Sequence, residues 1–152
     1  MTPGPLDEKV VAERSEWVRD MLEAIRGLPL DSEAEFMAEP RNVAAAESFV
    51  RRALEALLDL GRHILAKGFG DAPAEYKEVA RGLGEREVLT PGEAATFVRM
   101  AGYRNRLVHF YEMVSEGELY SICSERLDDI ESVLGGIHRW IREHPEQTRA
   151  GR

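Results

Sequence analysis

The sequence has a single cysteine, Cys123, among its 152 residues. One thiol excludes an intrachain disulfide framework and suits a reducing compartment. No apolar run approaches the roughly 20 residues that a membrane-spanning helix needs. The first residues, Met-Thr-Pro-Gly-Pro, lack the basic start and apolar core of a signal peptide. These absences predict a cytoplasmic protein with no membrane partner.

Basic residues are also in short supply, with 20 Lys and Arg against 28 Asp and Glu, a net charge of −8. This balance argues against a broad surface that coats nucleic acid, because such a surface needs a basic face. It leaves room for a small local basic site. The basic residues are 17 arginines and 3 lysines, and the planar fork of arginine binds phosphate through two parallel hydrogen bonds.

No stretch alternates apolar and polar residues for long enough to predict a strand. Apolar residues instead recur at steps of three, four and seven, which is the spacing of amphipathic helices. The pattern predicts an all-α fold, an antiparallel bundle of four main helices plus short ones. We expect a single helical domain over residues 1–152, with flexible ends at 1–6 and 145–152.

Capping signals set the expected helix bounds. Thr90, Pro91 and Glu93 combine a cap, a proline in the first turn and a glutamate three residues on. Ser32 and Glu35 form a similar capping box. The predicted helices are 7–26, 33–38, 42–67 with Asn42 as its cap, 74–83, 91–112 and 118–142.

Polar, titratable and aromatic side chains crowd together only in residues 100–112. The cluster comprises Arg104, Asn105, Arg106, His109 and Tyr111. On a regular helix Asn105 and His109 share a face, since they are four residues apart. Arg104 and His109 are five apart, about 140° around the axis, so direct contact is poor. They converge if the arginine reaches around, if the helix ends or kinks near Val108, or if a second chain supplies one of them.

These residue types fit phosphodiester cleavage in RNA without a metal. Histidine takes and gives protons near neutrality, because its unperturbed pKa is about 6.5. Arginine holds phosphate and offsets charge in the transition state, while asparagine orients the imidazole or a ribose hydroxyl. The candidate catalytic residues are therefore Arg104, Asn105 and His109, with Arg104 and Arg106 as phosphate ligands. We expect no metal and no cofactor, since one histidine without nearby cysteines or paired carboxylates is short of a ligand set.

A structural interpretation stands beside the catalytic one. A histidine at helical spacing among Leu, Val and Phe is typical of a core or interface position. The two arginines fit surface ion pairs in an acidic chain, and Tyr111 fits a core position with one hydroxyl hydrogen bond. The residues alone favour this structural interpretation and leave the catalytic one open.

The spacing of Arg104, His109 and Tyr111 resembles the Arg-x4-His-x-Tyr signature of HepT-like toxins. These toxins belong to the HEPN superfamily of small helical ribonucleases. The resemblance covers nearly the whole chain, because residues 53–63 (ALEALLDLGRH) and residues 90–109 also match the family in order and spacing. It implies a metal-independent endoribonuclease that acts as a homodimer, with the motifs of both subunits lining one cleft. A two-fold axis would bring a second His109 and a second Arg104 near the same phosphate.

The resemblance also assigns residues and a partner. Arg104 and His109 match the catalytic pair of the family, and Asn105 matches the polar position after the arginine. The implied partner is a minimal nucleotidyltransferase antitoxin that silences the toxin by transferring AMP from ATP to the motif tyrosine, here Tyr111. This chain lacks the Gly-Ser and paired-aspartate pattern of such an antitoxin, so it would be the toxin. The alternative is a non-catalytic HEPN dimer that binds a nucleotidyltransferase or a nucleotide without cutting RNA.

Overall fold

The computed structural model of the chain describes residues 4–109 and 114–148. No strand occurs among these residues, so the all-α prediction is confirmed. None of the described helices combines the length and apolarity needed to cross a membrane. The helices are α1 (Glu8–Arg26), α2 (Glu33–Met37), α3 (Pro40–Phe69), α4 (Tyr76–Glu85), α5 (Pro91–Val108), α6 (Glu116–Glu125) and α7 (Leu127–Glu143), followed by a 3₁₀ helix (Pro145–Thr148).

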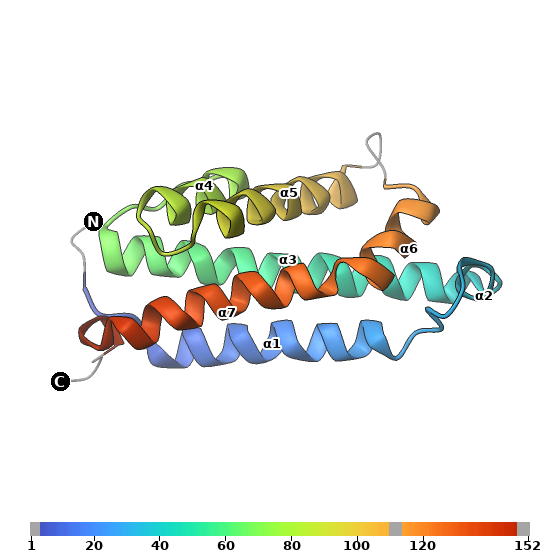
Figure 1. The fold of residues 1–152 in the computed structure, drawn as a ribbon, viewed down its shortest axis with the longest axis horizontal. Coiled ribbons are helices and arrows are strands. Elements are labelled where there is room, and N and C mark those ends of the chain that lie inside the picture. The colour runs from blue at the N-terminus through green and yellow to red at the C-terminus, as the bar shows by residue number, and fades with distance from the viewer. Residues whose placement is uncertain (1–3, 110–113, 149–152) are drawn as a thin grey trace.

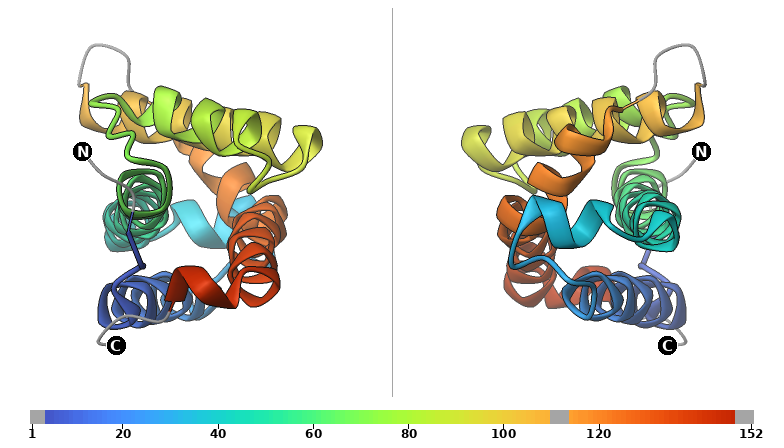
Figure 2. Two further views of the ribbon diagram at one scale, coloured as in Figure 1. Left: turned by 90° about the vertical axis from the view of Figure 1, so that its left-hand side faces the viewer. Right: turned by 90° about the vertical axis from the view of Figure 1, so that its right-hand side faces the viewer.

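The long helices α1, α3, α5 and α7 alternate in direction along the chain (Figure 1). Helix α3 lies in the middle, with α1 on one side of it and the α4–α5 pair on the other. In the end-on views, α4 and α5 run across the top of the molecule, while α3 and α7 are seen nearly along their axes (Figure 2). The predicted antiparallel bundle is therefore present, with α4 and α5 as an inclined layer on top.

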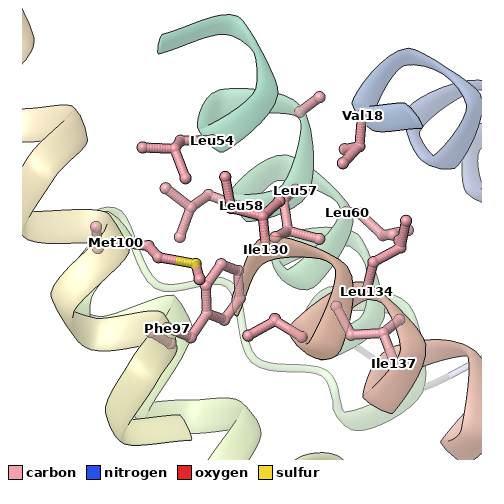
Figure 3. Packing of buried hydrophobic residues seen from close by; sticks show 14 of the residues in the cluster. Val18, Leu54, Leu57, Leu58, Leu60, Phe97, Met100, Ile130, Leu134 and Ile137 are labelled. Atoms are coloured by element: carbon pink, nitrogen blue, oxygen red, sulfur yellow. The ribbon is translucent and has the colours of Figure 1, made fainter. Parts of the chain in front are cut away.

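Helix α3 supplies the centre of the core because its apolar residues repeat at helical spacing. Its leucines face α1, α5 and α7 at once (Figure 3). The labelled core residues, all at most 4% exposed, are Val18 of α1, Leu54, Leu57, Leu58 and Leu60 of α3, Phe97 and Met100 of α5, and Ile130, Leu134 and Ile137 of α7. Phe97 and Met100 thereby anchor α5 to the centre of the core.

Helix α4 approaches α3 closely at Gly61. A Cβ atom at this position would lie 2.9 Å from Leu83 Cδ1 and 3.0 Å from Val79 Cγ1. Both distances are too short for an ordinary carbon contact in a packed interior. Glycine at position 61 therefore allows α4, and the residues at its start, to lie against α3.

Two predicted helix bounds are wrong. The start of the long helix carries a signal, since Pro40 occupies its first turn, whereas the break at Arg126 carries neither glycine nor proline. The long helix begins at Pro40 with Glu39 as its cap, while the Asn42 Nδ2 donates to the Phe36 carbonyl at 3.1 Å. The predicted helix 118–142 is two helices, α6 and α7, which meet at Arg126. The apolar stripe continues in register across this junction, so periodicity did not reveal it. The break turns α6 towards α2, where the rings of Phe36 and Tyr120 lie 5.5 Å apart.

The predicted helix 91–112 ends early. Helix α5 stops at Val108, and His109 has extended backbone angles, φ −102° and ψ 102°. Residues 110–113, which include Tyr111, lie outside the described residues.

The described parts of the two predicted flexible ends contact each other. Leu6 is fully buried, and its backbone N–H donates to the Gln147 carbonyl in the 3₁₀ helix.

Candidate functional site

The start of α5 is tied to α7. Thr90 Oγ1 accepts from the Glu93 backbone N–H at 3.1 Å, and Glu93 Oε1 accepts from the Thr90 backbone N–H at 2.9 Å, which is the predicted capping box. The Glu93 carboxylate also accepts two hydrogen bonds from Arg139 of α7, at 2.7 and 3.0 Å. These bonds, chiefly those from Arg139, hold the pKa of Glu93 below its usual value. The N-terminus of α5 is thereby fixed.

The opposite end of α5 opens on a pocket of about 520 Å³. Its lining comprises Arg62 of α3, Ala74 and Glu75, Tyr76 and Lys77 of α4, and Arg104, Asn105 and His109. The structure thus brings the three predicted catalytic residues together. One of the three predicted routes to convergence is present in the single chain, since α5 ends at Val108, and the His109 backbone N–H donates to the Asn105 carbonyl at 3.2 Å.

Arg104 is held by groups from two other helices. Its Nε and Nη2 each lie 3.0 Å from Oε2 of Glu55 on α3. Its guanidinium carbon lies 4.7 Å from the centroid of the Tyr76 ring, within the range of a cation–π contact. Nη1 donates to Asn105 Oδ1 at 3.4 Å. These contacts fix the plane of the guanidinium before any ligand binds.

Sequence reasoning missed Tyr76, Asp59 and Arg62 as members of this site. The Tyr76 hydroxyl donates to Asp59 Oδ1 at 2.7 Å. Burial, together with this hydrogen bond, raises the pKa of Tyr76 to about 12, so the hydroxyl stays protonated near neutrality. The guanidinium carbon of Arg62 lies 4.8 Å from the centroid of the same ring. Residues 53–63, which resemble the family, include Asp59 and Arg62, but that resemblance gave neither residue a role in the site.

Arg106 lies elsewhere. Its Nη1 and Nη2 form two hydrogen bonds of 2.7 Å to the carboxylate of Glu118 on α6. Arg106 is two positions after Arg104, so the two side chains point about 200° apart around the helix. Arg106 therefore lines a separate pocket, together with Val43 and Leu107. The structure therefore does not place Arg106 with Arg104, and its geometry fits the ion-pair interpretation.

Other reactive groups of the described chain lie away from this pocket. Cys123 is buried, and burial raises the pKa of its thiol to about 12, which keeps it protonated. Among residues 4–109 and 114–148, no group of three or more His, Cys, Asp or Glu side chains is placed to hold a metal ion. His109 is the one histidine that lines the pocket within the described residues.

A model of the ribonuclease HepT-like family matches residues 18–137, which include the Arg104 to His109 segment. The chain belongs to this family. The family assignment made from the Arg-x4-His-x-Tyr spacing is therefore confirmed. A HepT-like relative, the tRNA nuclease HepT of Aphanizomenon flos-aquae, is 24% identical over 122 residues, which are 80% of this chain and 81% of the relative.

Solved structures share the HepT-like fold. The tri-AMPylated HEPN toxin of Shewanella oneidensis, solved in complex with MNT antitoxin, has a TM-score of 0.78 and 18% identity, covering 86% of this chain and 97% of that one. The cytosolic protein YutE of Bacillus subtilis, of unknown function, has a TM-score of 0.74 and 20% identity, covering 91% of this chain and 93% of that one. These likenesses establish the fold.

Proposed function

We propose that this chain is the ribonuclease toxin of a toxin–antitoxin pair and that it cuts RNA in the Arg104 pocket. The observation that carries the proposal is the convergence of Arg104, Asn105 and His109 in one pocket of a HepT-like chain. Two comparisons support it. One relative is named a tRNA nuclease, and one structural neighbour is a HEPN toxin in complex with its antitoxin.

The proposed reaction is metal-independent attack by a ribose 2′-OH on the adjacent phosphate. The His109 imidazole removes the 2′-OH proton, and the oxygen bonds to phosphorus. The bond from phosphorus to the 5′-oxygen breaks, and that oxygen takes up a proton. Arg104 binds the non-bridging oxygens and offsets the charge that develops on them, while Asn105, next to both residues, orients the ribose or the imidazole. The products are a 2′,3′-cyclic phosphate and a 5′-hydroxyl.

The reaction needs a proton donor as well as a base, and the described lining of one chain offers a single imidazole. A homodimer would place a second His109 at the same phosphate, so that one accepts and the other donates. The proposed assembly is therefore a cytoplasmic homodimer. Its antitoxin would be a minimal nucleotidyltransferase that transfers AMP to Tyr111. An AMP group near the pocket would put a phosphate in competition with RNA for Arg104.

Replacing His109 by alanine tests the proposed cleavage. We expect the rate of tRNA cleavage by the purified protein to fall about 10²- to 10⁴-fold, the usual contribution of a general base or acid. The measurement is product formation on a denaturing gel. His144→Ala is the matched control, because His144 stacks on Trp140 with a centroid distance of 4.5 Å and does not line the pocket.

Unchanged cleavage by His109→Ala would refute the assigned base. If neither the wild type nor any variant cut RNA while the chain still bound a nucleotidyltransferase, the non-catalytic dimer would be the better description.

A further inference from the structure

The Arg104 pocket is a locally basic site on an acidic protein. Three cationic side chains line it, Arg62, Lys77 and Arg104, against one acid, Glu75. The chain as a whole carries a net charge of −8. Glu55 and Asp59 pair with Arg104 and Arg62 from outside this lining. The groups that face the pocket are therefore mostly cationic, which favours an anionic ligand.

Arg62 is held in the pocket by neutral groups more than by acids. Its Nε donates to the Pro73 carbonyl at 3.2 Å, and its Nη2 donates to the Ala74 carbonyl at 2.9 Å. Among the described residues, Arg62 pairs with one carboxylate. Its Nη1 lies 3.4 Å from Asp59 Oδ1, an oxygen that also accepts from the Tyr76 hydroxyl. Backbone carbonyls carry no net charge, so they hold the guanidinium without offsetting its positive charge, which Asp59 balances through the 3.4 Å ion pair.

Arg62 and Arg104 both contact the aromatic ring of Tyr76. Each guanidinium carbon lies within 5 Å of the centroid of the Tyr76 ring, at 4.8 and 4.7 Å. The two cations therefore contact one ring, and each also has a carboxylate beside it, Asp59 for Arg62 and Glu55 for Arg104. A guanidinium has five N–H donors, and the bonds described above use three of those on Arg62. Donors remain for a phosphate.

We propose that Arg62 is a second phosphate ligand of the RNA site, which binds a phosphate next to the one held by Arg104. This inference rests on the proposed ribonuclease function and adds a residue to it. Arg104 acts on the phosphate that is cut, and Arg62 holds the neighbouring phosphate and so fixes the register of the strand. The chain binds RNA despite its acidity because both contacts lie in one pocket.

The test is the salt dependence of RNA binding. Each phosphate contact releases counterions, and losing one contact lowers the slope of log K against log salt by about 0.7 for a single strand and about 0.9 for a duplex, the two forms that a folded tRNA combines. The parent protein is His109→Ala, which leaves the RNA intact. Binding of a fluorescein-labelled tRNA is measured by anisotropy at several salt concentrations. The substitution Arg62→Gln is made in this parent. We expect it to raise the Kd for tRNA about 10-fold and to lower the slope of log K against log salt by about 0.7–0.9.

Two further variants separate phosphate binding from a purely structural role. Arg62→Lys keeps the charge and should keep the slope of the parent, although it loses the fork that clamps the Pro73 and Ala74 carbonyls. Arg14→Gln, on the exposed face of α1, should change neither Kd nor slope. Thermal melting of every variant establishes that it is folded.

An Arg62→Gln slope equal to that of the parent would overturn the inference, whatever happened to the affinity. An equal loss of slope in Arg62→Lys and Arg62→Gln would overturn it too, because the charge would not be the cause. Wild-type cleavage of tRNA reports on the proposed function separately. If the wild type cuts tRNA and the Arg62→Gln slope is unchanged, only the inference fails. If the His109→Ala parent does not bind tRNA and the wild type does not cut it, both fail.

Discussion

At the scale of single residues, Arg104 depends on partners that are distant in the sequence. Glu55, which binds its Nε and Nη2, is 49 residues away and belongs to another helix. Glu55 also accepts from Arg51 at 2.9 Å, so its charge is shared between two arginines. A lysine at position 104 would lack the planar fork that meets Glu55 along one edge and a phosphate along another. The chemistry proposed for the pocket therefore needs arginine at this position.

Tyr111 is the residue on which the proposed silencing depends. We predict that co-expression with the cognate nucleotidyltransferase adds one or more AMP groups to the wild-type chain and none to Tyr111→Phe. Denaturing mass spectrometry of the purified chain measures the added AMP. Native mass spectrometry of the same sample should give the mass of a homodimer.

Tyr103→Phe, on α5, is the matched control and should be modified like the wild type. Retained adenylylation of Tyr111→Phe would remove Tyr111 as the acceptor, and an active monomer would refute the two-chain site.

The sequence predicted only those site residues that lie close together along the chain. Arg104, Asn105 and His109 stood out because they fall within six positions. Their partners Glu55 and Tyr76 did not, because helical periodicity assigns a residue to a face but does not say which distant helix that face meets. A cation–π contact or a hydrogen bond to a carboxylate on another helix produces no pattern among neighbouring residues of the sequence.

At the scale of helices, two adjacent glycines of α7 have opposite surroundings. A Cβ atom at Gly136 would lie 2.8 Å from Glu93 Oε1 and 2.9 Å from Leu89 Cδ2, whereas a Cβ atom at Gly135 would meet nothing within 4 Å. Glu93 cannot easily move aside, since it is bonded to Thr90 and Arg139. The close approach of α7 to the start of α5 therefore needs glycine at position 136.

This contrast predicts opposite effects of the same substitution. Gly136→Ala should lower the free energy of unfolding by about 1–3 kcal/mol, because overpacking displaces the Glu93 carboxylate. Gly135→Ala should raise it by about 0.5–1 kcal/mol, because alanine costs less backbone entropy in a helix. Urea denaturation of the two variants and the wild type measures both values. Equal effects of the two substitutions would show that the α5–α7 contact is not as close as described.

Capping signals and periodicity predicted where most helices lie, but they did not predict where α5 ends or where α6 gives way to α7. The capping box of Thr90 and Glu93 gave the start of α5 correctly, because its signal is local. The end of α5 at Val108 and the junction at Arg126 carry neither glycine nor proline, and apolar residues continue beyond both. Only tertiary packing decides such ends, and the end at Val108 is the one that assembles the pocket.

At the scale of the whole molecule, two half-buried histidines join distant elements. The Asp7 backbone N–H at the start of α1 donates to His63 Nε2 of α3 at 3.0 Å, which requires that nitrogen to be unprotonated. His138 Nε2 of α7 lies 2.8 Å from Ser15 Oγ of α1. Burial lowers the pKa of both histidines below the ordinary value of 6.5. The neighbouring charges of Arg19 and Arg142 lower that of His138 further.

These shifts predict a loss of stability in mild acid. As the pH falls below 6.5, the two histidines of the unfolded chain take up protons before those of the folded chain. Unfolding is then favoured, and the free energy of unfolding should fall between pH 6.5 and about 5, above the range in which most carboxylates titrate. Urea denaturation at several pH values measures this. The double variant His63→Gln, His138→Gln should have a flatter profile in this window, and an equally steep one would assign the effect to other groups.

The function proposed for the molecule depends on one chemical event, attack by a 2′-OH on phosphate in the pocket of Arg104 and His109. The most direct measurement is the identity of the RNA ends that the purified wild-type protein produces in the presence of a metal chelator. We predict a 2′,3′-cyclic phosphate on one fragment and a 5′-hydroxyl on the other, detected by mass spectrometry of the fragments. Products with a 3′-hydroxyl and a 5′-phosphate, or cleavage that the chelator abolishes, would contradict the proposed mechanism.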